Sequence, residues 1–504
     1  MCTFESRYPS LPFEGTYLGP VVAAERVAFA PFALVLGACA SSTLAIGLGR
    51  SWLELDRCDV VLAGGVDAVS TFVAAGFESL RATATERGPR PFREGRDGLA
   101  LGEGAAIVAL ARVQNARIWV TGFGASCDAV HLTAPDRTGA GLTRAARSAI
   151  GSATEIGLVS AHGTATDFND AAEALAIKAC APEAKVHALK GAIGHTLGAA
   201  GALELLSAMT AIEKKVAPPS VGEGTAIEGV NILDRAEPLS TKTVLKLSSA
   251  FGGTNAALVA SLDPTSPPIE KRAVYVSRGV HVTAPLAASM LAARTGYAED
   301  KIARADDLVR LALTAVAELE ERVGPVRGAG IITGLGLATI DTNAAFLARI
   351  RERGAARSEP RRFPYTTPNA AGGECAVAFG LTGPMFAVGG GSHGGIEALA
   401  VASDLIATGV ADRIVVVAAD EGGAASRTVD PDCQSGAVAL LVAGAPLEAR
   451  IEAAGVSFGP GHLDEVPKGC TAHRALTPLA TGRPEMLEVV LPWGGIAKAH
   501  LFWL

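Results

Sequence analysis

Val35-Leu-Gly-Ala-Cys-Ala-Ser-Ser-Thr-Leu-Ala-Ile46 is the stretch around which the chain is organised. It starts at the end of an apolar run that predicts a short buried strand. It then turns through Gly37-Ala-Cys39 and continues with apolar residues at helical spacing. Cys39 is therefore expected at a strand-to-helix junction, where free backbone N–H groups and the helix dipole favour an anion and lower the pKa of a thiol. The alternative is a small buried core cysteine, which is the commoner role of a lone cysteine.

The composition predicts a large α/β protein in a reducing compartment. A chain of 504 residues is too long for one hydrophobic core, so two or more domains are expected. Hydrophobic residues make up 49% and charged residues 19%, which excludes disorder, and a net charge of −7 argues against nucleic acid as a main partner. No apolar run reaches the roughly 18 residues needed to span a bilayer. The eight cysteines include no CxxC pair, so we expect a cytoplasmic protein without a disulfide framework or a metal site.

Glycine-rich loops follow several predicted strands in the first half. One loop, in Leu158-Val-Ser-Ala-His-Gly-Thr-Ala-Thr-Asp-Phe-Asn-Asp170, carries His162. The next, in Val186-His-Ala-Leu-Lys-Gly-Ala-Ile-Gly-His-Thr-Leu-Gly-Ala-Ala-Gly201, carries Lys190 and His195. Strands that alternate with helices in this way imply α/β layering.

The clearest domain boundary is Asp263-Pro-Thr-Ser-Pro-Pro268, where prolines and polar residues interrupt the apolar pattern. We therefore predict a first domain over residues 1–262, a linker over 263–272 and a second domain over 273–504.

An internal repeat relates the two halves. The second copy carries Ser392 where the first has Cys39, and it is much shorter between Ser457 and Trp493 than the first between Gly124 and Phe251. It therefore lacks the segment that holds the two histidines and the lysine. The aligned stretches include Gly37–Ile46 with Gly390–Leu399, Asp59–Asp67 with Asp412–Asp420, and Gly104–Leu110 with Gly436–Val442.

A cysteine at a helix N-terminus, two histidines in glycine-flanked loops, a lysine and a Gly-Gly turn form a plausible set for acyl transfer. A thiolate can take an acyl group from a thioester, and backbone N–H groups in two glycine-rich turns can stabilise the developing oxyanion. Two neutral imidazoles could hold a thioester carbonyl and stabilise an enolate. Spacing alone does not bring these loops together.

Residues 20–263 resemble the β-ketoacyl-acyl-carrier-protein synthases, from just before the nucleophile turn of that family to its end. The resemblance is carried by the Cys39 turn and by the two histidine motifs, in family order and spacing. It implies a thiolase-like fold, layered α/β/α/β/α, present here as two unequal copies. Relative to the family, about one hundred residues before Cys39 are missing, and the usual Phe-Gly-Phe-Gly-Gly turn is Ser249-Ala-Phe-Gly-Gly253.

The resemblance also implies roles for particular residues. Cys39 would accept the acyl group, and His162 and His195 would bind the malonyl thioester and promote its decarboxylation. Lys190 would form an ion pair with Glu173. Phe251 would be the gating aromatic residue, its N–H joining that of Cys39 in the oxyanion hole. The implied partner is an acyl carrier protein bearing acyl and malonyl thioesters, and no cofactor is implied.

The second half resembles a ketosynthase copy that has lost its catalytic residues, as in chain-length-factor partners. The two halves are expected to pack like the subunits of a ketosynthase dimer, within one chain or between chains, and the second half is expected to help shape the acyl tunnel. One alternative is a catalytically inactive partner or remnant that binds a ketosynthase or carrier protein. Another is a thiolase-like acyltransferase that uses acyl-CoA, which is less favoured because thiolases pair a histidine with a second cysteine.

Overall fold

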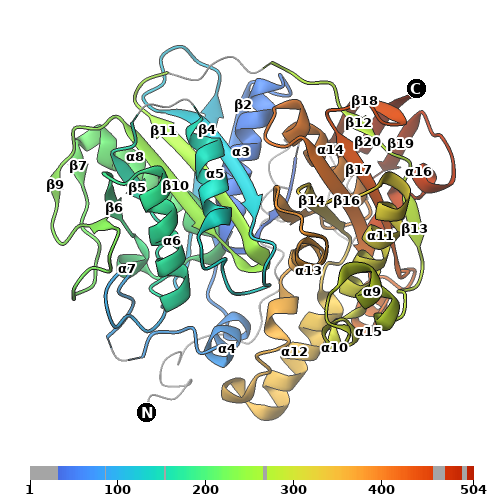
Figure 1. Ribbon diagram of the computed structural model, residues 1–504, viewed down its shortest axis with the longest axis horizontal. Coiled ribbons are helices and arrows are strands. Elements are labelled where there is room, and N and C mark those ends of the chain that lie inside the picture. Colours follow the sequence, from blue (N-terminus) through green and yellow to red (C-terminus); the bar gives the residue numbers. More distant parts are fainter. Residues whose placement is uncertain (1–31, 86, 152–154, 265–269, 458–470, 491–495) are drawn as a thin grey trace.

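The structure is a computed structural model that describes residues 32–85, 87–151, 155–264, 270–457, 471–490 and 496–504. Figure 1 shows a blue-to-green lobe built from the first half of the chain and a yellow-to-red lobe built from the second. Part of the predicted linker, residues 265–269, lies outside the described residues. The division into domains at this linker stays a prediction.

A six-stranded sheet forms the frame of the first lobe. Helix α5 (Ala140–Ile150) packs on one face, and helices α3 (Ser41–Glu54) and α8 (Ala200–Lys214) pack on the other. The inner strands are almost entirely buried, as their continuous apolar sequences predict. The strand order is β4 (Trp119–Cys127), β11 (Thr254–Ser261), β10 (Thr243–Ser249), β5 (Leu158–Ser160), β6 (Lys185–His187) and β8 (Asn231–Ile232).

A ten-stranded sheet forms the frame of the second lobe. Helix α14 (Gly394–Ala407) is buried along nearly its whole length, with β14 and β16 on one side and β18 and β20 on the other. Helix α11 (Asp307–Val323) covers the opposite face of β16 and β17. The order is β1 (Val35–Leu36), β15 (Met385–Val388), β14 (Gly330–Leu335), β16 (Arg413–Asp420), β17 (Gly436–Ala443), β12 (Tyr275–Val276), β18 (Ala449–Ser457), β20 (Ile496–Trp503) and β19 (Met486–Val490), with β13 (Val280–Val282) beside β17.

Two strand pairs, one in each lobe, have the same register. Strand β2 (Val60–Asp67) pairs antiparallel with β3 (Gly104–Ala111), and Asp67 lies opposite Gly104. In the second lobe β16 pairs with β17, and Asp420 lies opposite Gly436. This is the register in which the sequence repeat aligns the two copies, so the predicted correspondence of these strands is confirmed.

The hydrogen bonds at the ends of these strands repeat as well. Asp67 Oδ2 accepts the N–H of Gly198 at 3.0 Å, and Asp420 Oδ2 accepts the N–H of His473 at 3.1 Å. The contacts therefore align His473 with Gly198, a correspondence that the sequence repeat did not include. In each lobe the described residues build alternating helical and sheet layers, α/β/α/β, as the layered fold predicts.

The two lobes share a sheet at their centre. Strand β1, which leads to Cys39, pairs antiparallel with β15, which leads to Ser392, so that Val35 lies opposite Val388. A single hydrophobic core continues from α3 and α8 across β15 to α14. The strand that leads into the Cys39 turn is therefore paired with a strand of the second half.

Helix α14 also holds the first lobe through polar contacts. The Leu34 N–H donates to Glu397 Oε1 at 2.7 Å. Arg57 forms an ion pair with the buried Asp404, whose second oxygen accepts the Trp52 indole N–H at 3.0 Å. Buried polar groups of this kind are stable only when they are paired, so these contacts fix how the lobes meet.

The outer face of the β2–β3 pair is exposed, with Leu62 at 52% and Ile107 at 66% of their full accessible surface. In the second lobe α11 covers the corresponding face. Within the described part of the first half, no helix takes that place. The apolar composition produces no membrane span either: none of the helices in the described ranges is long and apolar enough to cross a bilayer.

Candidate active site

Cys39 lies at the predicted strand-to-helix junction, between β1 and α3. The turn η1 (Ala38–Ala40) holds Ala38 at a φ of 48°, a left-handed conformation that costs energy for a non-glycine residue and is typical of functional sites. A Cβ on Gly37 would come within 2.4 Å of Leu44 Cδ1, so a larger residue here would have to displace the Leu44 side chain. Ser41 Oγ accepts the Gly37 N–H at 3.0 Å and donates to the Ala38 carbonyl at 2.7 Å. The turn is thus fixed on both sides of Cys39.

Burial opposes ionisation of the Cys39 thiol. The residue is only 9% exposed, and burial raises the pKa of its thiol to about 12. The ammonium of Lys190 and the N–H of Cys39 itself lower this pKa, whereas the carboxylates of Asp67 and Glu204 raise it further. The predicted lowering of the Cys39 pKa is therefore wrong, and the site holds a neutral thiol.

We expect alkylation of Cys39 by iodoacetamide to accelerate steeply with pH. Only the thiolate reacts, and below the pKa its fraction rises about tenfold per pH unit. The rate, followed by mass spectrometry of the Cys39 peptide, should therefore rise about tenfold per unit from pH 7 to pH 10. Free cysteine is the reference, because its rate levels off above about pH 8.5. A plateau for Cys39 in the same range would contradict the raised pKa.

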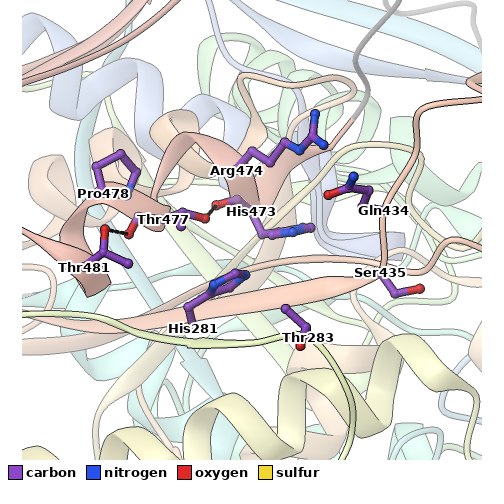
Figure 2. A pocket seen from close by; sticks show the side chains of 9 residues that line it. All are labelled: His281, Thr283, Gln434, Ser435, His473, Arg474, Thr477, Pro478 and Thr481. Atoms are coloured by element: carbon purple, nitrogen blue, oxygen red, sulfur yellow. Dashed lines mark hydrogen bonds between the residues drawn. The ribbon is translucent and has the colours of Figure 1, made fainter.

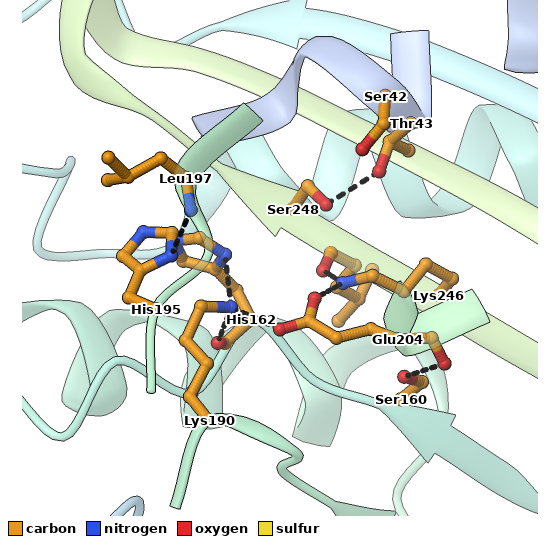
Figure 3. Close-up of polar contacts among 12 residues, drawn as sticks. Ser42, Thr43, Ser160, His162, Lys190, His195, Leu197, Glu204, Lys246 and Ser248 are labelled. Atoms are coloured by element: carbon orange, nitrogen blue, oxygen red, sulfur yellow. Dashed lines mark hydrogen bonds and ion pairs between the residues drawn. The ribbon is translucent and has the colours of Figure 1, made fainter. Parts of the chain in front are cut away.

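His162 and His195 form a pair of imidazoles (Figure 3). Their ring centroids lie 5.3 Å apart, with the ring planes at 83°. The Leu197 N–H donates to His195 Nδ1 at 3.2 Å, and Lys190 Nζ lies 3.2 Å from His162 Nδ1. An ammonium and a backbone amide are donors here, so both Nδ1 atoms act as acceptors and the proton of each neutral ring sits on Nε2. The site thus contains two imidazole N–H donors.

The surroundings keep both imidazoles neutral. Burial lowers the pKa of His162 and of His195 well below the usual value, and the ammonium groups of Lys190 and Lys246 lower each pKa further. At neutral pH the pair therefore donates hydrogen bonds without carrying charge.

Lys190 belongs to a buried ion network. Glu204 forms ion pairs with Lys190 and with Lys246, the latter at 2.8 Å, and all three side chains are at least 98% buried. Lys190 Nζ also donates to the His162 carbonyl at 2.5 Å. The predicted ion pair between Lys190 and Glu173 is wrong, because Glu204 takes that place.

Glu173 instead supports the His162 loop from helix α6 (Asp167–Cys180). Its two carboxylate oxygens accept the N–H groups of His162 at 2.6 Å and Gly163 at 2.8 Å. Burial raises the pKa of Glu173 to about 7, while these two hydrogen bonds lower it. Glu173 therefore orients the backbone that carries His162.

Glu204 and Lys246 are site residues that the sequence analysis missed. Lys246 interrupts the apolar strand Leu245-Lys-Leu247, and Glu204 interrupts the apolar run Leu203-Glu-Leu205. A charged residue inside an apolar element is rare unless it is paired, so each interruption indicated a buried partner.

Phe251 lies in the same apolar cluster as Cys39. Its ring centroid is 5.7 Å from that of Phe77, and the cluster also contains Leu197, two residues after His195. The turn η1 packs against η2 (Leu197–Ala199). The structure thus gathers the predicted site residues in one region of the first lobe. No group of three or more His, Cys, Asp or Glu side chains placed to hold a metal occurs in the described part of the chain.

A separate cavity of about 460 Å³ lies in the second lobe (Figure 2). His281 and His473 line it and stack on each other with ring centroids 5.6 Å apart, and Asp420 lies 3.0 Å from His473 Nδ1. Ser435 and Arg474 also line it. None of the predicted site residues contributes to this cavity.

Two family models match the sequence. The model described as "Beta-ketoacyl synthase, N-terminal domain" matches residues 22–116 and 268–440, and the model described as "Beta-ketoacyl synthase, C-terminal domain" matches residues 118–223. The first model thus matches once in each half of the chain.

Curated relatives include the 3-oxoacyl-[acyl-carrier-protein] synthase 2 of Coxiella burnetii, 36% identical over 251 residues, and that of Staphylococcus aureus, 35% identical over 252 residues. Each match covers 45% of this chain and 61% of the relative, so the chain spans about three fifths of the length of these proteins. A solved structure, "PfaC Keto synthase-Chain length factor", superposes with a TM-score of 0.72 at 15% identity, covering 92% of this chain and 71% of that one. This likeness shows the fold, and the predicted thiolase-like ketosynthase fold is confirmed.

Proposed function

Because the chain belongs to the β-ketoacyl synthase family, we propose that it catalyses decarboxylative Claisen condensation between an acyl thioester and a malonyl thioester, both carried by an acyl carrier protein. The observation that carries this proposal is the pair of neutral imidazoles, each with Nδ1 already occupied as an acceptor and a proton on Nε2. Two convergent N–H donors are what an enolate oxygen requires.

In the first step Cys39 Sγ attacks the acyl carbonyl. The bond to the carrier sulfur breaks, the carrier leaves as a thiol, and the proton of Cys39 ends on it. Neither imidazole takes this proton, because both Nδ1 atoms are occupied and both Nε2 atoms are already protonated. The N–H groups of Cys39 and Phe251 would stabilise the oxyanion.

In the second step the malonyl thioester loses CO₂, and the electron pair of the broken C–C bond forms an enolate. The Nε2–H groups of His162 and His195 stabilise its oxygen. The enolate carbon then attacks the acyl carbonyl on Cys39 and expels the Cys39 sulfur, which regains a proton from solvent. The product is a β-ketoacyl thioester of the carrier, two carbons longer than the acyl substrate.

The second half would be a degenerate ketosynthase-like copy that pairs with the first as a chain length factor does. The common strand register and the repeated Asp67–Gly198 and Asp420–His473 contacts support this assignment. If Gly198 is aligned with His473, then His195, three residues earlier, is aligned with Cys470. Cys470 lies outside the described residues. This copy would thus have no imidazole at that position.

The second half would also bound the acyl chain. Phe346 and Phe363, both from the second half, pack against Phe72, Phe77 and Phe251 of the first. These rings belong to the cluster around Cys39. An acyl group on Cys39 would therefore extend toward side chains of the second half, which would set its length.

The alternative, an inactive partner or remnant, is less supported because Cys39, both imidazoles and the Lys190 network are all in place. The experiment that separates the two measures acyl loading by intact mass after incubation with acyl carrier protein bearing acetyl to palmitoyl groups. We expect the wild-type protein and a Cys58→Ala control to gain the acyl mass, and Cys39→Ala to gain none.

Equal loading of the wild type and Cys39→Ala would exclude Cys39 as the acceptor. If the folded wild-type protein takes up no acyl group and releases no CO₂ from malonyl carrier protein, the inactive alternative would be correct.

A further inference from the structure

Asn369 of the second half reaches the Phe251 turn of the first. The residue is fully buried and immediately precedes helix α13 (Ala370–Phe379). Its Nδ2 donates to the Phe251 carbonyl at 2.8 Å and lies 3.4 Å from Thr254 Oγ1. A backbone carbonyl of the Phe251 turn is thus held by a side chain from the other half of the molecule.

Two glycines make the backbone of the Phe251 turn intrinsically flexible, so its conformation depends on the hydrogen bonds made to it. Gly252 and Gly253 have φ angles of 86° and 82°, which glycine adopts readily along with many other conformations. Within the first half, the Gly252 N–H donates to the Leu132 carbonyl at 2.6 Å. The Phe251–Gly252 peptide is thus held at both ends, its N–H by Leu132 of the first half and its carbonyl by Asn369 of the second.

The second half also forms the wall behind this turn. A Cβ on Gly252 would lie 2.6 Å from Met385 Cε and 2.8 Å from Asn369 Nδ2. A Cβ on Gly373 would lie 2.8 Å from the Cα of Gly252. The two backbones touch here, so any movement of the turn has to be away from the second half.

A second hydrogen bond connects the turn to the strand that supports Cys39. Thr254 Oγ1 donates to the Met385 carbonyl at 2.9 Å, and Met385 begins β15. The same strand pairs with β1, which leads to Cys39. Strand β15 of the second half therefore contacts both the strand that leads to Cys39 and the Phe251 turn.

We infer that Asn369 is a positioning residue: it holds the Phe251 turn in register with Cys39, so that the first half's site is complete only with the second half in place. Among the described residues its Oδ1 has no hydrogen-bond partner, and a buried unpaired carbonyl destabilises the fold. The amide N–H is thus the part of Asn369 that the structure uses. The effect on acyl transfer rests on the proposed function, whereas the effect on the turn does not.

Hydrogen–deuterium exchange tests the effect on the turn directly. In Asn369→Ala, a peptide that covers residues 250–254 should exchange about tenfold faster than in the wild type, because one buried hydrogen bond is lost. Ser358→Ala is the matched control: Ser358 Oγ also donates across the halves, to the Ala75 carbonyl at 2.8 Å, and it does not touch this turn. The control should leave exchange at 250–254 unchanged.

Two reactions at Cys39 supply the second readout. Acyl transfer from the carrier protein needs the Phe251 N–H and should slow about tenfold in Asn369→Ala. Alkylation by iodoacetamide does not need that N–H and should stay within twofold. Asn369→Ser replaces Asn369→Ala if the alanine variant does not fold, because serine is a good residue at a helix N-terminus but too short to reach the Phe251 carbonyl.

Unchanged exchange at 250–254 in the folded variant would overturn the inference, as would equal changes in the Ser358→Ala control. Faster exchange in a protein whose wild type takes up no acyl group would support the positioning role and reject the proposed function instead.

Discussion

Glu204→Ala is expected to destabilise the protein by about 3–5 kcal/mol, the usual effect of removing one partner from a buried ion pair. The change leaves two ammonium groups, those of Lys190 and Lys246, inside the first lobe without a carboxylate. Chemical denaturation that follows the fluorescence of the folded protein would measure the loss. The lobes share a core, so we expect one broad loss of stability rather than local fraying.

Glu213→Ala is the control from the same helix, α8. Glu213 lies 3.6 Å from Arg117, whose side chain is 89% exposed, and exposed pairs of this kind contribute at most about 1 kcal/mol. If both variants lose the same free energy of unfolding, the buried network contributes no more to stability than the exposed pair.

The stability of Glu204→Ala should also depend on pH in a way that identifies unpaired charge as the cause. Burial already lowers the pKa of Lys246, and Glu204 is the main group that raises it. Without Glu204 the pKa of Lys246 in the folded state falls further. At any pH between this lowered value and the pKa of Lys246 in the unfolded chain, the folded variant therefore binds fewer protons than the unfolded chain. Stability then rises with pH, and the deficit of the variant should shrink from pH 7 toward pH 10. A deficit that stays constant would show that lost packing, and not unpaired charge, is the cause.

The partner of Lys190 shows where sequence reasoning stops. Cys39, His162 and His195 lie in loops or turns between a strand and a helix, as their spacing predicts. The spacing of motifs in the sequence does not reveal which helix packs against a given loop. Glu173 and Glu204 are both on buried helix faces, one on α6 and one on α8. Only the three-dimensional packing brings α8 above Lys190 and leaves Glu173 to bind backbone N–H groups.

The prediction of a lowered pKa for Cys39 is wrong for a related reason. A helix N-terminus in the sequence predicts a lowered pKa, but the outcome depends on burial, and part of that burial comes from the second half. Phe363 and Phe346, more than 300 positions away in the chain, belong to the cluster that encloses Cys39. Asn369 escaped prediction in the same way, because its partner, Phe251, lies on the other copy of the repeat. The repeat predicted the matching strand register of the two copies, whereas side-chain contacts, within a copy or between copies, were not predictable from it.

His162→Ala and His195→Ala are each expected to slow release of CO₂ from malonyl carrier protein by about 10²–10³, the usual cost of losing one oxyanion donor. His195→Gln tests the assigned tautomer, because a glutamine amide N–H can stand near the position of Nε2–H. It should retain more activity than His195→Ala. Acylation of Cys39 does not use these donors and should change much less in all three variants.

His187→Ala is the matched control, a buried histidine on β6 whose Nε2 lies 3.5 Å from Ser207 Oγ, and it should stay within a few-fold of the wild type. A comparable loss in His187→Ala would mean that any buried imidazole is needed for folding. A comparable loss of Cys39 acylation in His195→Ala would mean that the imidazole acts on the thiol. That result would contradict the tautomer assignment, because a ring whose Nδ1 accepts from Leu197 has no lone pair left for the thiol proton. The two half-reactions therefore separate a role at the enolate from a role at the nucleophile.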